Sequence, residues 1–151
     1  MKMMIQKQRL FAGLLILGSA LLTFRTIKMI SQGSLERLAL WVSALLILEL
    51  IIDLACFLTS ARWFITNNKQ QNKFPLYFAA ASTILHAIRV FIYAIGRVGP
   101  WINFDLKPEY VANNEVNWSL GWLYFAVIMS VVGLIVLFGI WRYLKRKSSI
   151  G

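Results

Sequence analysis

The stretch LALWVSALLILELIIDLACFL at positions 38–58 decides the fold of this chain. Its length matches the ~20 residues that an α-helix needs to cross the hydrocarbon core of a bilayer. Its only charged residues are Glu49 and Asp53. Charge in mid-membrane costs a few kcal/mol or more, so such side chains normally face protein, find partners and mark function. The stretch therefore predicts a transmembrane helix with two acids on a protein-facing side.

Three further apolar stretches, 10–30, 76–98 and 118–143, are also long enough to span a bilayer. Each is continuously apolar, whereas barrel strands alternate over about ten residues. The whole chain has 151 residues, of which 59% are hydrophobic and 15% charged, and its mean hydropathy is +0.66. These values exclude an ordinary soluble domain. We expect an all-α fold, a single integral membrane domain over residues 1–151 built as an antiparallel bundle of four spans.

Basic residues indicate which side of the membrane each end occupies. Those before the first expected span, between the second and third, and after the fourth all fall on one side: Lys2, Lys7, Arg9, Arg62, Lys69, Lys73, Arg142, Lys145, Arg146 and Lys147. The positive-inside rule then predicts that both termini lie in the cytoplasm. We expect the plasma (inner) membrane as the location. The net charge of +10 thus reflects topology and contact with anionic lipid, and we predict no nucleic-acid partner.

The N-terminus leaves an alternative open. Basic residues, a short apolar run and the small residues Gly18, Ser19 and Ala20 have the outline of a cleavable signal peptide. The apolar run continues to Phe24, which favours a retained span. Cleavage would leave three spans in unchanged orientation.

Two connections carry features of interest. Ser34 is placed to cap the helix of the second span. The connection 99–117 is long and contains Trp101, Phe104 and Tyr110, followed by Trp118. Its aromatic residues fit an interfacial belt, and its length also fits an extracytoplasmic lid or partner surface.

The ionisable residues of the second and third spans form the main candidate site. Glu49 and Asp53 are four residues apart and share one helix face. In the third span, helical spacing puts a polar set on one stripe: Ser82, His86, Arg89 and Tyr93. A rise of ~1.5 Å per residue puts Glu49 and His86 near mid-membrane, Arg89 ~4 Å outward and Asp53 ~7 Å inward.

Matching depths predict contacts between these two spans. A Glu49–Arg89 ion pair is available, with His86 and Tyr93 as hydrogen-bonding neighbours. Asp53 is left to pair with His86, to take a proton or to accept a bond from Ser82. Two more distant residues are secondary candidates: Arg25 in the first span and Ser130 in the fourth.

Catalytic and metal sites have less support. His86, Glu49 and Asp53 are metal-ligand types, but Arg89 beside them repels a cation. The single Cys56 excludes Cys-pair motifs, and no nucleotide-binding loop or Ser-His-Asp order is visible. We therefore predict neither metal nor cofactor, and the sequence favours a non-enzymatic protein over an enzyme.

Three functions remain. The first is a membrane module whose buried cluster binds a ligand, an ion or a proton for transport or sensing. The second is an accessory or scaffold subunit, with the cluster purely structural and a membrane complex or a second copy of the chain as partner. The third is an intramembrane enzyme acting on a lipid-like substrate through the acids and His86.

Overall fold

A computed structural model describes residues 2–66, 73–97, 100–111 and 120–148. The described chain is helical, and its only β-type pairing is an isolated bridge between Leu38 and Leu106. The all-α expectation is confirmed for these residues. The helices are α1 (Lys2–Ser31), α2 (Ser34–Arg37), α3 (Leu40–Thr66), α4 (Lys73–Ile95), α5 (Pro108–Val111) and α6 (Leu120–Ser148).

Three of these helices are long and apolar enough to cross a membrane: α1 over Gln8–Ser31, α3 and α4. Among the described residues, α6 contributes a shorter apolar segment, Ser130–Gly139. The expected fourth span, 118–143, overlaps α6, although residues 118 and 119 lie outside the described part. The structure thus supports a membrane protein with three long apolar helices and a shorter one.

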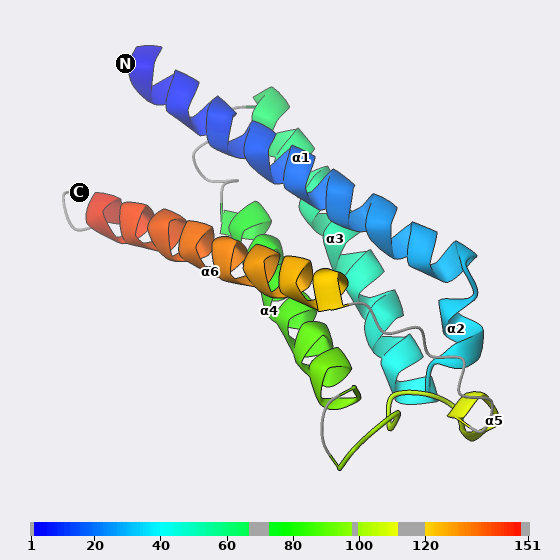
Figure 1. Ribbon diagram of the computed structural model, residues 1–151. Helices are drawn as coiled ribbons and strands as arrows, with labels where there is room; N and C mark the ends of the chain where they lie inside the picture. Colours follow the sequence, from blue (N-terminus) through cyan, green and yellow to red (C-terminus); the bar gives the residue numbers. More distant parts are fainter. Residues whose placement is uncertain (1, 67–72, 98–99, 112–119, 149–151) are drawn as a thin grey trace.

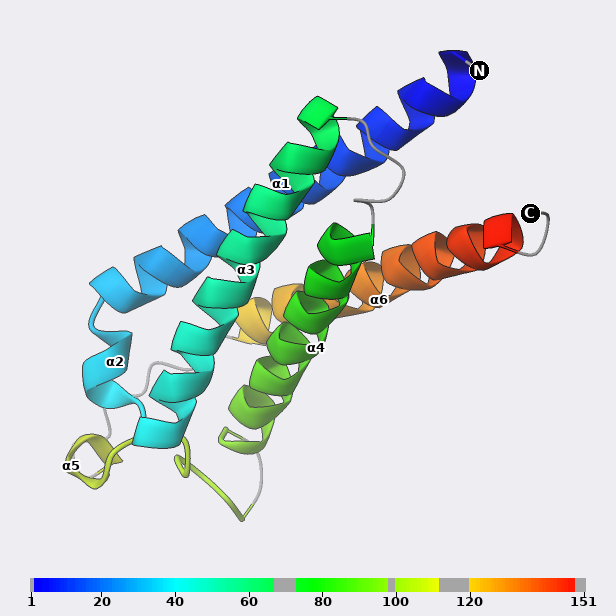
Figure 2. The ribbon, with the colours of Figure 1, turned by 180° about the vertical axis from the view of Figure 1, so that it is seen from behind.

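The long helices pack in chain order. α3 lies between α1 and α4, and α6 packs on α4. Figures 1 and 2 show the start of α1 and the end of α6 at one end of the molecule, with α2 and α5 at the other. Neighbouring long helices therefore run antiparallel, and α3 is the helix in the middle of the first three.

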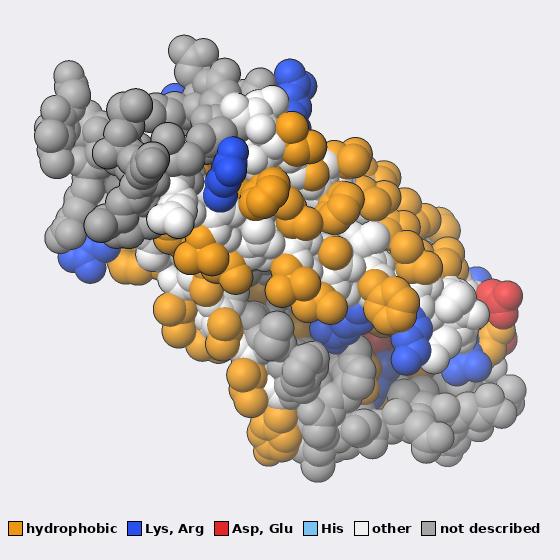
Figure 3. Space-filling model, turned by 90° about the horizontal axis from the view of Figure 1, so that it is seen from above, with side chains coloured by type: hydrophobic (Ala, Val, Ile, Leu, Met, Phe, Trp, Pro, Cys, Tyr) orange, Lys and Arg blue, Asp and Glu red, His pale blue; other side chains and the backbone are white. Residues whose placement is uncertain are grey.

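The interior of this protein is mostly polar and its surface mostly apolar. Large hydrophobic residues are exposed along every long helix, for example Leu40, which is 84% exposed. Figure 3 shows hydrophobic side chains over most of one described face, with Lys and Arg toward its ends. The buried polar residues are Gln8, Ser19, Thr26, Ser43, Glu49, Asp53, Ser60, Ser82, His86, Arg89 and Asp105. This reversal of the soluble pattern fits lipid as the surrounding solvent.

The buried residues of α3 and α4 follow a regular spacing of three and four. The main buried stripe of α3 consists of Val42, Leu46, Glu49, Asp53, Cys56, Ser60 and Trp63. The matching stripe of α4 consists of Pro75, Ala79, Ser82, His86 and Arg89. This is the spacing that keeps one helix face against a neighbour along its whole length. The two stripes therefore meet at every turn.

At the α2 end, the described residues 96–97 and 100–107 lie against the start of α3. The expected third span reached position 98, but α4 ends at Ile95 because the chain turns at Gly96. A side chain at Gly96 would force Asp105 to shift, since an added Cβ would lie 2.5 Å from an Asp105 carboxylate oxygen. Asp105 is held by two Arg97 nitrogens at 2.8 and 3.1 Å, and its carbonyl accepts from the Ala39 amide at 2.8 Å.

The aromatic residues of this connection join the same structure. Phe104 stacks on Trp41 of α3 with ring centroids 5.6 Å apart, and Trp101 meets Phe104 edge-on at 6.5 Å. The described part of the connection therefore packs as a cap on the helix ends. Trp118 lies outside the described residues.

The expected cap at Ser34 is wrong. Ser34 begins the separate short helix α2, whose N-cap is Gly33 with φ of 80°, and no side chain caps it. The chain then extends at Leu38 before α3 begins at Leu40. Just before α3, the Ala39 backbone amide instead donates to the Asp105 carbonyl, which belongs to the connection after α4. Local sequence does not reveal this contact.

Candidate functional site

Two acids lie on the protein-facing stripe of α3. Glu49 and Asp53 are four residues apart and both have 0% relative exposure. Because α3 is flanked by α1 and α4, side chains on this stripe meet other helices and not lipid. The two acids therefore avoid the cost of a carboxylate in hydrocarbon only through partners within the protein.

Those partners come from the facing stripe of α4. Ser82, His86 and Arg89 are buried there, each 8% exposed or less. Their spacing of four and three residues puts them on one helix face. We call Glu49, Asp53, His86 and Arg89 the charged cluster.

The predicted Glu49–Arg89 ion pair is confirmed. The Arg89 Nε group donates to both carboxylate oxygens of Glu49, at 2.8 and 2.7 Å. The contact therefore uses the inner nitrogen of the guanidinium, and the two terminal nitrogens point elsewhere.

His86 connects the two acids. Its Nε2 lies 3.0 Å from Asp53 Oδ2, and its Nδ1 lies 3.2 Å from Glu49 Oε2. The Ser82 hydroxyl donates to Asp53 Oδ1 at 2.5 Å. Two of the alternatives for Asp53, a pair with His86 and a bond from Ser82, thus occur together, while proton uptake by Asp53 stays a prediction.

One ring nitrogen of His86 has two neighbours. Besides Glu49 Oε2, Nδ1 lies 3.1 Å from the Arg89 Nη2 group. A guanidinium only donates hydrogen bonds and a carboxylate only accepts them. Nδ1 therefore accepts from Arg89 when it is unprotonated, and it lies at ion-pair distance from the Glu49 carboxylate when it carries a proton.

Helix α1 closes the cluster on its other side. The Arg89 Nη1 group donates to the Met29 sulfur at 3.3 Å, and Arg25, one turn earlier, interacts electrostatically with Arg89 and Glu49. The secondary candidate Arg25 thus belongs to the surroundings of the cluster. Met29 was not predicted, because a methionine in an apolar span carries no charge signal.

Two further candidates also border other parts of the structure. The Tyr93 ring, one turn beyond Arg89, lies under the Arg97 guanidinium at 4.8 Å from CZ to centroid. Tyr93 therefore borders the Arg97–Asp105 pair at the end of α4. Ser130 is half-buried on α6, whose main packing partner is α4.

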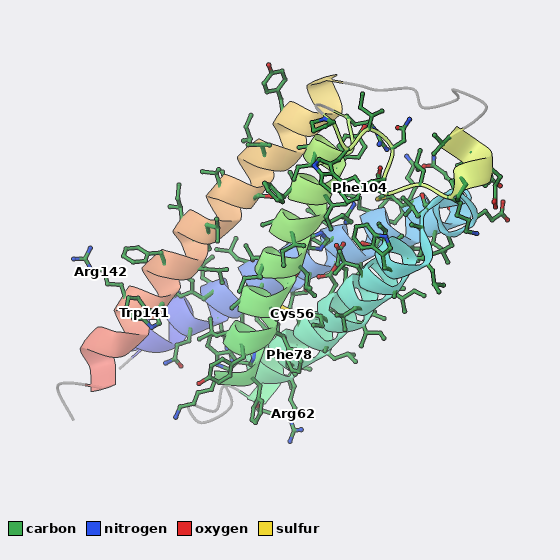
Figure 4. All side chains as sticks on the ribbon, turned by 90° about the horizontal axis from the view of Figure 1, so that it is seen from below. Cys56, Arg62, Phe78, Phe104, Trp141 and Arg142 are labelled. Carbon is green, nitrogen blue, oxygen red and sulfur yellow. The ribbon has the colours of Figure 1, made fainter. Side chains whose placement is uncertain are left out.

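Toward the other end, the polar line continues through Cys56. Its sulfur lies 3.8 Å from the Pro75 carbonyl oxygen and 4.0 Å from the Ser60 hydroxyl. Cys56 is a buried free thiol, and Figure 4 shows it among the helices and not on the outer surface. Small polar residues thus fill the α3–α4 contact on the side of Asp53 that faces away from Glu49.

Within the described part of the chain, no group of three His, Cys, Asp or Glu residues is arranged to hold a metal ion. The geometry explains this for the charged cluster, because both ring nitrogens of His86 already face carboxylates on opposite sides. The arrangement is suited to holding a proton between fixed acceptors.

Comparison with known proteins gives no relative: no family model, curated protein or solved structure matches the chain.

Proposed function

We propose that this protein is a non-enzymatic integral membrane module whose charged cluster takes up and releases a proton as part of the transport or sensing of a small ligand. The observation that carries the proposal is the position of His86 between two fully buried carboxylates, at 3.0 and 3.2 Å.

Both proton states of His86 find partners in one geometry. With a neutral ring, Nε2–H donates to Asp53 and Nδ1 accepts from Arg89 Nη2. With a charged ring, Nε2–H keeps Asp53, and Nδ1 lies at an ion-pair distance of 3.2 Å from Glu49 Oε2. A histidine that exchanges one partner for another without moving is well suited to reversible proton binding, since little reorganisation separates its states.

The proposal includes the plasma membrane as location and a cytoplasmic position for both termini. Figure 4 supports it: Arg62 and Arg142 point away from the helices at the end opposite to Phe104. Exposed bases at the end that holds both termini are what the positive-inside rule expects of the cytoplasmic side. Fusing a reporter that is active only in the cytoplasm to each terminus tests the orientation.

The chain has a single histidine, so ¹⁵N-histidine labelling gives one pair of ring signals. We expect these signals, recorded on the full chain in nanodiscs, to move between neutral and charged forms as pH changes. In Asp53→Asn the ring signals should differ from those of the wild type at the same pH, because the partner of Nε2 is no longer a carboxylate. A ring that stays in one form from pH 4 to pH 9 (roughly the range that folded histidines cover) contradicts the proposal.

A second candidate function is an accessory subunit of a membrane complex. It is favoured by the Ser82–Asp53 and Arg89–Glu49 bonds, which link neighbouring helices as structural polar contacts do. Asp53→Asn discriminates the two, because it keeps groups that can bond to Ser82 and His86: a proton-binding module stays assembled and changes its His86 ring signals, whereas a scaffold loses copurifying partners. Copurification from native membranes supplies the second readout.

A further inference from the structure

Among the described residues, neither terminal nitrogen of Arg89 donates to a carboxylate. Nε is committed to Glu49, while Nη1 donates to the thioether of Met29 at 3.3 Å and Nη2 to Nδ1 of His86 at 3.1 Å. A thioether is a weak acceptor. Nη1 and Nη2 together form the part of arginine that is best shaped for a carboxylate. Among the described residues of α1, this fork meets the Met29 sulfur and no strong acceptor.

Protonation of His86 removes one of these two acceptors. Once Nδ1 carries a proton it no longer accepts from Nη2, and the charged ring forms an ion pair with Glu49 Oε2, 3.2 Å away. Among the described residues, the two terminal nitrogens of Arg89 then keep only the Met29 sulfur as an acceptor. A buried cationic donor without an acceptor is costly, so the protonated state favours an incoming acceptor beside Arg89.

The α1 wall offers a second unsatisfied group at this level. Thr26 has 0% exposure, and its hydroxyl has no hydrogen-bond partner among the described residues. Ser19 of α1 is a hydrogen-bonding neighbour of Cys56 of α3. Because the two helices are antiparallel, seven residues forward in α1 (Thr26) matches seven residues back in α3 (Glu49). Thr26 thus shares the level of Glu49, on the same face as Met29 three residues later.

The charges around His86 also change with its proton. Glu49 and Asp53 from α3 and Arg89 from α4 face it. Arg25 from α1 interacts electrostatically with Arg89 and Glu49. The only described charged side chain of α6 is Arg142, which is exposed. Two acids against two arginines sum to zero with His86 neutral and to one positive charge with His86 protonated. A single negative charge restores the balance.

We propose that a small monocarboxylate binds between Arg89, Arg25 and Thr26, displaces the Met29 sulfur from Arg89, and does so together with protonation of His86. This inference rests on the proposed proton binding and names the ligand class. Proton and carboxylate enter as a neutral pair, with no covalent step.

The test records the His86 ¹⁵N signals of the full chain in phosphatidylcholine nanodiscs while sodium acetate is added at constant pH. At a pH where the ring is mostly neutral, saturating acetate should raise the protonated fraction about tenfold, a typical coupling between two sites. Laurate is a parallel probe with the same headgroup. A larger effect of laurate assigns the carboxylate to the lipid phase, and a larger effect of acetate assigns it to water; either supports the proposal.

Variants separate the new site from the proton site. Thr26→Val should weaken the acetate effect about fivefold, the cost of one lost hydrogen bond, and leave the titration without acetate unchanged. Thr26→Ser keeps the hydroxyl and should retain the effect. Thr59→Val is the matched control, because that hydroxyl bonds to its own helix at Ala55.

Two results overturn the inference and leave proton binding standing. One is a His86 that titrates with pH but does not respond to acetate or laurate. The other is an equal response to chloride in the wild type and in Thr26→Val, which marks ionic screening. A His86 that does not titrate at all overturns the proposed function as well.

Discussion

Breaking the Glu49–Arg89 pair from its two sides should have unequal costs. The pair joins α3 to α4 at 2.7 and 2.8 Å with both side chains buried. At an effective dielectric constant of about 20, charges at this separation attract by about 4–6 kcal/mol, which offsets their desolvation. Removing one partner of such a buried pair costs about 3–5 kcal/mol, because the other charge is left uncompensated.

The asymmetry follows from what the remaining side chain can do. Glu49→Gln leaves a guanidinium that cannot lose its proton, so we expect the upper end of that range. Arg89→Met leaves a carboxyl that can take a proton, so we expect the lower end. The double variant should cost about 2–3 kcal/mol less than the sum of the single variants, since contacting residues couple by this order.

The assay is the free energy of unfolding in mixed micelles, measured by titration with denaturing detergent and circular dichroism. Glu36→Gln serves as the control, because Glu36 is exposed on α2 and surface changes stay within about 0.5 kcal/mol. Additive single costs, or a larger cost for Arg89→Met than for Glu49→Gln, would refute the reasoning.

Three further predictions concern the cap, the α3 interface and the topology. Gly96→Ala should destabilise the cap by about 1–3 kcal/mol, since its Cβ would collide with Asp105. Hydrogen exchange over 96–107 measures this loss. Gly139→Ala is the control and should behave as wild type, because an added Cβ there meets nothing within 4 Å. Cys56 is 3% exposed and should react with a membrane-permeable maleimide only after unfolding; rapid reaction of the native protein would contradict the packing of α3. Cytoplasmic reporters should be active at both termini, and activity at one terminus alone would exclude the proposed orientation.

The charged cluster was predictable because its signal is both strong and local. A charge in an apolar span must face protein, and a fixed rise per residue gives its depth. Matching Glu49 to Arg89 by depth therefore predicted the ion pair that the structure shows. The same arithmetic placed His86 near both acids, but it left open whether Asp53 pairs with His86, bonds to Ser82 or takes a proton.

The parts that could not be predicted lack such a signal. Met29 and Thr26 are uncharged residues of an apolar helix, and their position beside the cluster depends on how α1 is rotated against α3. The cap depends on the Asp105 carbonyl reaching Ala39 from a distant part of the chain. Neither a helix rotation nor a long-range backbone bond follows from periodicity.

The position of α3 between two helices gives the cluster its chemical range. A polar residue on an outer helix such as α6 meets one packed neighbour, whereas Glu49 on the central helix has α4 on one side and α1 on the other. Arg89 consequently contacts both His86 and Met29 of α1. In the proposed function, protonation of His86 therefore changes the hydrogen bonding of an arginine that lies against α1. Coupling of this kind needs contacting groups with two alternative hydrogen-bond arrangements. The Nδ1 atom of His86, within reach of one donor and one acceptor, provides that alternative.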